Sequence, residues 1–133
     1  MSPFRWIDLF GDGSLRMAMG FDGFVGVANI AELSIAFGKC NTTKKFKVLA
    51  VGGSTQATAA ADDFLREIED GSAAKKTKRW LDQQPTAKQI DHLRRQGIQV
   101  SGFDFAWTKY KAACMLNFMW NRAVIESAVE KYL

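Results

Sequence analysis

The chain changes character near residue 71, and this change constrains its fold more than any other feature. Before it, short runs of strand-forming residues alternate with glycine turns; after it, apolar residues recur at helical spacing. The charge changes at the same place. Residues 1–70 carry seven basic and nine acidic side chains, a net charge of −2, whereas residues 71–133 carry eleven and five, a net charge of +6. Such a split suggests two roles, with an anionic partner binding to the basic half.

Length and composition narrow the class of protein. The 133 residues suit one ordinary domain or two very small ones, and 47% apolar with 24% charged residues is typical of a globular chain. No apolar run reaches 18 residues, and Arg5 and Asp8 interrupt the apolar N-terminus, so we expect no membrane partner and no signal peptide. Cys40 and Cys114 form neither a disulfide framework nor a zinc motif, which favours a reducing, cytoplasmic setting.

The first half, residues 1–70, predicts a small antiparallel sheet of about four strands. The clear strand-forming runs are residues 4–10, 15–19, 24–27 and 45–51. Residues 33–37 form a further candidate strand, although Ala31-Glu32-Leu33 equally suits a helical turn. Asp22-Gly23 is the dipeptide that most favours a two-residue hairpin.

One amphipathic helix is predicted to cover this sheet. Ser54 is the expected N-cap, the apolar face runs from Ala57 to Ile68, and Gly71 stops the helix. Gly52-Gly53-Ser54 would also suit a phosphate at the helix N-terminus, but no nucleotide-hydrolysing motif accompanies it, and a simple strand-to-helix turn is favoured.

No metal site is predicted in the first half. Asp8, Asp12 and Asp22 have a spacing that matches no calcium loop, and aspartates are common in turns.

Residues 71–84 are interpreted as a basic linker or hinge. The segment begins with Gly71-Ser72 and carries four basic residues in five positions, Lys75 to Arg79, before its first large apolar side chain, Trp80.

Residues 85–133 predict a compact unit of three helices. Thr86 and Gln89 form a capping box for the first helix, which ends at Gly97. A second helix runs from Thr108 to about Trp120 and is apolar around most of its circumference, so we expect it to be central. Asn121 can cap the third. The fold class is therefore α+β: a small antiparallel sheet with one packed helix, followed by this three-helix unit.

The second half also resembles a known protein region. The residues are Trp80, then Gln84-Pro85-Thr86-Ala87-Lys88-Gln89-Ile90, Leu93 and Gly97-Ile98, followed by Thr108-Lys109-Tyr110-Lys111-Ala112-Ala113 and Asn121-Arg122-Ala123-Val124-Ile125. This pattern resembles the C-terminal accessory region of phage-type DEAD/DEAH-box (superfamily 2) helicases over about residues 79–126. Residues 4–70 are loosely similar to the segment that precedes it. The motor domains are missing from this sequence, so the resemblance implies a role in holding nucleic acid or a partner, in the cytoplasm of a bacterial host cell, and not unwinding or ATP hydrolysis.

Cations interleaved with aromatic side chains are typical of nucleic-acid binding, because the cations neutralise phosphates and the rings stack on unpaired bases. The candidate residues are Lys75, Lys76, Lys78, Arg79, Trp80, Lys88, Arg94, Arg95, Trp107, Lys109 and Lys111, with Phe103, Phe105 and Tyr110 as further aromatic residues. A plainer interpretation makes Trp80, Trp107 and Tyr110 core or lid residues, and the 75–79 run a solvated linker.

Two functional hypotheses follow from these residues. The first is a non-enzymatic phage or mobile-element accessory protein that binds single-stranded or forked nucleic acid, with DNA as the favoured form, through its basic half. The alternative is a protein-interaction module that docks through exposed apolar residues of the sheet onto a helicase or host nucleoprotein complex and inhibits it. With one exposed histidine, His92, and no nucleophile pattern, we expect no enzyme, no cofactor and no metal.

Overall fold

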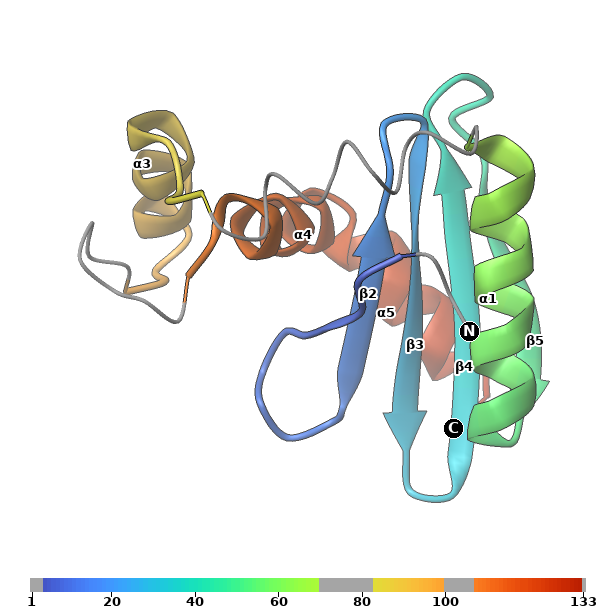
Figure 1. Ribbon diagram of the computed structural model, residues 1–133. Coiled ribbons are helices and arrows are strands. Elements are labelled where there is room, and N and C mark those ends of the chain that lie inside the picture. The colour runs from blue at the N-terminus through green and yellow to red at the C-terminus, as the bar shows by residue number, and fades with distance from the viewer. Residues whose placement is uncertain (1–3, 70–82, 100–106, 133) are drawn as a thin grey trace.

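The computed structural model describes residues 4–69, 83–99 and 107–132. Its centre is a five-stranded antiparallel sheet in which each strand pairs with its neighbours in the sequence, in the order β1-β2-β3-β4-β5 (Figure 1). The strands are β1 (Ile7–Asp8), β2 (Leu15–Met19), β3 (Gly23–Ile30), β4 (Leu33–Cys40) and β5 (Phe46–Gly52). The ambiguous segment at 33–37 is therefore a strand.

The first predicted strand is much shorter than expected. Only Ile7 and Asp8 pair with β2. The Asp8 carboxylate accepts hydrogen bonds from the backbone N–H groups of Gly11 (3.1 Å) and Gly13 (2.9 Å), and this local competition turns the chain away from the sheet.

The turn between β2 and β3 differs from the prediction by one residue. Phe21 and Asp22 are its central residues, and Gly23 already belongs to β3. The carboxylate of Glu69, at the end of the first helix, accepts hydrogen bonds from both central N–H groups, at 3.1 Å and 2.6 Å. A contact with a residue almost fifty positions away thus sets this turn.

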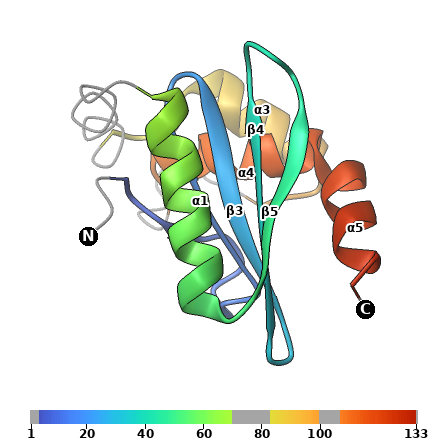
Figure 2. The same ribbon diagram turned by 90° about the vertical axis from the view of Figure 1, so that its right-hand side faces the viewer.

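Side chains alternate between the two faces of the sheet, and both faces are covered. On one face, Ala18, Val25 and Val27 pack against helix α1 (Ser54–Ile68). On the other, Met17, Phe24 and Phe37 join a core with the C-terminal helices. Figure 2 shows α1 along the sheet and the C-terminal helices beyond it. The two-sided cover leaves little of the apolar sheet face for the docking role in the alternative hypothesis.

The helices follow the predicted pattern, with one correction. They are α1, α3 (Ala87–Arg95), α4 (Lys109–Trp120) and α5 (Arg122–Glu130). The N-cap of α1 is Gly53 and not Ser54, and no side chain caps this helix. The Ser54 hydroxyl instead accepts a hydrogen bond from Arg16, a partner that the local pattern does not reveal.

Helix α4 is central, as predicted. It contacts α3, α5 and β2, and six of its twelve residues are buried. The core around it unites α4 residues with Leu15 and Met17 of the sheet and Leu93 of α3, so residues from both halves of the chain share one cluster. Helix α3 lies on the side of α4 that faces away from the sheet (Figure 1).

The architecture confirms the predicted α+β class. Within the described ranges, no helix has the length and apolar character needed to cross a bilayer. The predicted linker at 71–84 lies almost entirely outside the residues that the structure describes.

Candidate nucleic-acid interface

Helix α3 carries the first part of the candidate site, and both of its ends are fixed by local chemistry. At the start, the Thr86 hydroxyl accepts from the Gln89 N–H (3.1 Å) and the Gln89 side chain accepts from the Thr86 N–H (3.0 Å), which is the predicted capping box. At the end, Gly97 has a φ of +83°, and the N–H of Ile98 donates to the Leu93 carbonyl. The two caps define where the exposed face of α3 begins and ends.

Helix α4 is fastened to the sheet through Tyr110. The phenol oxygen accepts from the Met19 N–H (2.9 Å) and lies 2.8 Å from the Arg5 carbonyl, to which it donates. Burial raises the pKa of the Tyr110 phenol, and burial raises the pKa of the neighbouring Cys114 thiol to about 12. Tyr110 is fully buried, so this aromatic residue belongs to the core and does not stack on bases.

A groove of about 200 Å³ lies between α3 and α4. We name it the α3–α4 groove; it is lined chiefly by Lys88, Gln89 and His92 of α3 and by Leu116, Asn117 and Trp120 of α4. The His92 and Trp120 rings meet edge to face with centroids 6.2 Å apart. The Trp120 side chain is 63% exposed, more than any other large apolar side chain in the described part of the chain.

The cations of α3 lie around its exposed surface. Lys88 lines the groove, and Arg95 shares its helix face, seven residues along. Arg94 is exposed at the edge of that face. Arg95 forms an ion pair with Asp91 at 2.9 Å, but the side chains are 69% and 57% exposed, so the pair is weak and Arg95 can exchange it for a phosphate.

The cations of α4 divide between its two sides. Lys109 follows the same helical row as Ala113, Leu116 and Trp120, the side of the groove. Lys111 points the other way, and its ammonium lies 4.7 Å from the centroid of the half-buried Trp107 ring. Lys109 therefore lies on the same side of α4 as α3 and its cations, whereas Lys111 lies on the other side, against Trp107.

Five of the predicted candidates are outside the described residues: Lys75, Lys76, Lys78, Arg79 and Trp80. Phe103 and Phe105 are outside them as well.

Trp120 is the residue that the sequence interpretation missed. It closes a helix that is apolar around most of its circumference, and such a pattern predicts burial for each of its residues. The sequence signal that could have indicated exposure is its position at the last residue of α4, directly before the C-cap Asn121. Exposure there depends on how α3 packs, which local sequence does not show.

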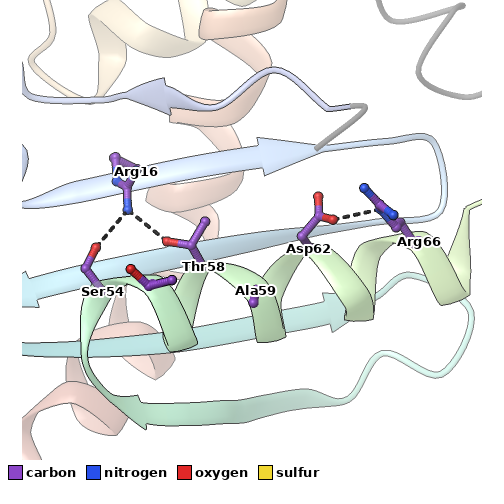
Figure 3. A pocket seen from close by; sticks show the side chains of 7 residues that line it. Arg16, Ser54, Thr58, Ala59, Asp62 and Arg66 are labelled. Carbon is purple, nitrogen blue, oxygen red and sulfur yellow. Dashed lines mark hydrogen bonds and ion pairs between the residues drawn. The ribbon is translucent and has the colours of Figure 1, made fainter. Parts of the chain in front are cut away.

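A second cavity, of about 450 Å³, lies on the other side of the molecule along α1 (Figure 3). In it the Arg16 guanidinium donates to the Thr58 hydroxyl (3.0 Å) and approaches that of Ser54 (3.5 Å), while Arg66 pairs with Asp62 (2.7 Å). Three carboxylates, Asp62, Asp63 and Glu67, lie on this helix. This excess of negative charge makes the α1 side less suited to a polyanion than α3, which carries a single carboxylate.

The described residues hold no cluster of three or more histidine, cysteine or acidic side chains that could bind a metal ion. What the α3–α4 region offers chemically is positive charge, an exposed indole and a narrow groove.

Sheet, helices and groove together define an α+β domain with a cationic helical edge, a class suited to binding or accessory roles. Residues 1–132 match the family described as the C-terminal domain of the mitochondrial helicase Irc3, and the chain belongs to this family. The match confirms the predicted resemblance at the level of a helicase C-terminal accessory region. No curated protein and no solved structure matches the chain.

Proposed function

We propose that this chain is a non-enzymatic helicase accessory domain that holds single-stranded or forked DNA against α3 and the α3–α4 groove. The observation that carries the proposal is the exposed face of α3, where Lys88, Arg94 and Arg95 outnumber the single carboxylate, Asp91. Lys109 adds a fourth cation on the groove side of α4. Cations on one side of a domain attract a phosphate backbone without regard to base sequence.

The proposal predicts a definite salt dependence. Each phosphate that is neutralised on a single strand contributes about −0.7 to the slope of log K against log salt concentration, so four cations give a slope of about −3. The measurement is fluorescence anisotropy of a labelled 20-nucleotide thymidine oligomer with the full chain at several salt concentrations. No detectable binding at low salt would contradict the proposal.

A charge-matched pair of variants locates the interface. Arg94→Gln/Arg95→Gln removes two charges from α3 and should weaken binding about tenfold at low salt and make the slope less steep by about 1.4. Lys45→Gln/Lys47→Gln removes two charges from exposed positions before and within β5, and should leave both values nearly unchanged. Equal losses from the two variants would show that only net charge matters and would remove α3 from its assigned role.

The alternative role, docking onto a helicase or host nucleoprotein complex and inhibiting it, keeps one supporting observation. Val48 and Val51 remain exposed on β5, an edge strand of the sheet. A partner that co-purifies with the chain after nuclease treatment, and is lost with Val48→Ser/Val51→Ser, would favour this role over the first.

The source and setting of the protein belong to the proposal as well. The motif at residues 79–126 supports a phage-type or mobile-element accessory protein of superfamily 2 helicases, acting in the cytoplasm of a bacterial host.

A further inference from the structure

We infer that the α3–α4 groove is a subsite for one unpaired nucleobase, stacked on the indole of Trp120; this inference rests on the function proposed above. The indole is 63% exposed although it belongs to the most apolar of the helices that the structure describes. His92 meets it edge to face, so the ring is held in position with much of its surface in water. A held, exposed indole beside cations is what base stacking requires.

The size of the groove suits a single base. Its volume of about 200 Å³ is smaller than the roughly 300–1,000 Å³ of pockets that enclose whole drug-sized molecules. Lys88 lines the same groove, so its ammonium can contact the phosphate next to a base that is stacked on Trp120. The two interactions are thus complementary: the indole contacts the base and the ammonium contacts the backbone.

The polar groups of the groove wall are largely used within the protein, so the subsite should tolerate any base. The Gln89 amide accepts from the Thr86 N–H (3.0 Å) and donates to the Lys109 carbonyl (3.3 Å). The Asn117 amide donates to the Ala113 carbonyl at 2.9 Å. Stacking needs only the face of a base, and every base has one.

A paired base cannot enter the groove, because it is already stacked and hydrogen-bonded inside the duplex. Binding through Trp120 therefore selects single strands and the unpaired arm of a fork. The cations of α3, in contrast, attract single and double strands alike.

The test compares side chains and oligomers with the full chain, by anisotropy at two salt concentrations. Trp120→Ala should weaken binding of a 20-nucleotide thymidine oligomer about tenfold, by the same factor at both salt concentrations, since stacking releases no counterions. Trp120→Phe should keep most of the affinity, and Trp120→Leu, which retains apolar bulk without an aromatic face, should lose it. Tyr132→Ala, which removes another exposed aromatic ring, is the control and should have no effect.

A second arm does not depend on how the variants fold. The unmodified chain should bind an abasic oligomer of the same length about as weakly as Trp120→Ala binds the thymidine oligomer. For the abasic oligomer, the affinities of Trp120→Ala and of the unmodified chain should be equal, because the base that the indole would stack on is already missing. Equal affinity of the unmodified chain for the two oligomers would overturn the stacking subsite and leave the cationic face intact. Binding of neither oligomer at low salt would overturn the proposed function itself.

Discussion

Two amphipathic helices, α1 and α3, share the same sequence pattern but differ in what they pack against and in the charge that they present to solvent. Helix α1 buries Ala57, Ala61 and Leu65 against three strands and presents two carboxylates, Asp63 and Glu67, and one arginine outward. Helix α3 buries only Leu93, packs chiefly on α4, and presents three cations and one carboxylate. The comparison shows that amphipathic periodicity identifies a helix that packs, whereas the packing partner and the outward charge distinguish α1 from α3, the helix proposed to bind nucleic acid.

The largest expected effect tests the structural side of this comparison. Leu65→Ala should lower the free energy of unfolding by about 2–5 kcal/mol, because it opens a cavity between α1 and the sheet. Leu93→Ala should lower it less, because α3 can separate from α4 while the sheet and α1 stay folded. Urea unfolding followed by circular dichroism gives both values.

The same two variants should have the opposite order of effect on oligonucleotide affinity. Leu93→Ala loosens α3 and should weaken oligonucleotide binding, whereas Leu65→Ala, measured below its unfolding transition, should not. If Leu65→Ala weakened binding as much, the assignment of structure to α1 and binding to α3 would be wrong.

The next effect concerns the attachment that unites the two regions. Tyr110→Phe leaves the Met19 N–H without its acceptor and the Arg5 carbonyl without its donor, and should cost about 1–3 kcal/mol of stability. Phe118→Leu, a change in the same helix that removes no hydrogen bond, is the control for loss of packing alone. A negligible change for Tyr110→Phe would mean that the hydrogen bonds of Tyr110 do not help to hold α4 to the sheet.

These attachments also explain how much of the molecule could be predicted from its sequence. The capping box at Thr86 and Gln89 and the helix start at Thr108 were predictable, because each depends on residues three positions apart. The β3–β4 turn was not, because its first residue, Ala31, adopts a φ of +54° that sequence patterns assign to glycine or asparagine. A local pattern cannot show that an unfavourable turn residue is outweighed by pairing along two eight-residue strands.

The candidate site was predictable to a similar extent. The sequence placed Lys88, Arg94 and Arg95 on a short helix and left Tyr110 open between a stacking residue and a core residue. Tyr110 is buried, as the plainer interpretation predicted, whereas the exposed Trp120 was not among the candidates. Both residues belong to α4, whose apolar circumference does not indicate which side the sheet covers and which side α3 leaves open. That choice is made by tertiary packing.

A smaller effect is expected on the pH dependence of stability, through Glu69 at the C-terminal end of α1. Burial raises the pKa of Glu69, although the Phe21 and Asp22 N–H groups oppose the shift. The folded state therefore binds the proton of the Glu69 carboxyl group more tightly than the unfolded state does. The contribution of this protonation to stability is fully present below about pH 4.5 and is lost as the pH rises through the higher native pKa. Urea unfolding of the unmodified chain and Glu69→Gln between pH 4 and 7 measures it; only the variant should lack this loss. If the free energy of unfolding changed with pH in the same way for both proteins, Glu69 would not be the group responsible.

The smallest effect isolates the outward charge of α3. Asp91→Asn removes the only carboxylate of that helix and frees Arg95 from an exposed ion pair, so stability should change by less than about 1 kcal/mol. Oligonucleotide affinity should rise about twofold, because one repulsive charge is lost and one guanidinium becomes available to phosphate. Asp63→Asn makes the same charge change on the exposed side of α1 and should leave affinity unchanged. A gain from Asp63→Asn alone would place the nucleic acid on α1, because the position of the charge, and not its sum, distinguishes the two helices.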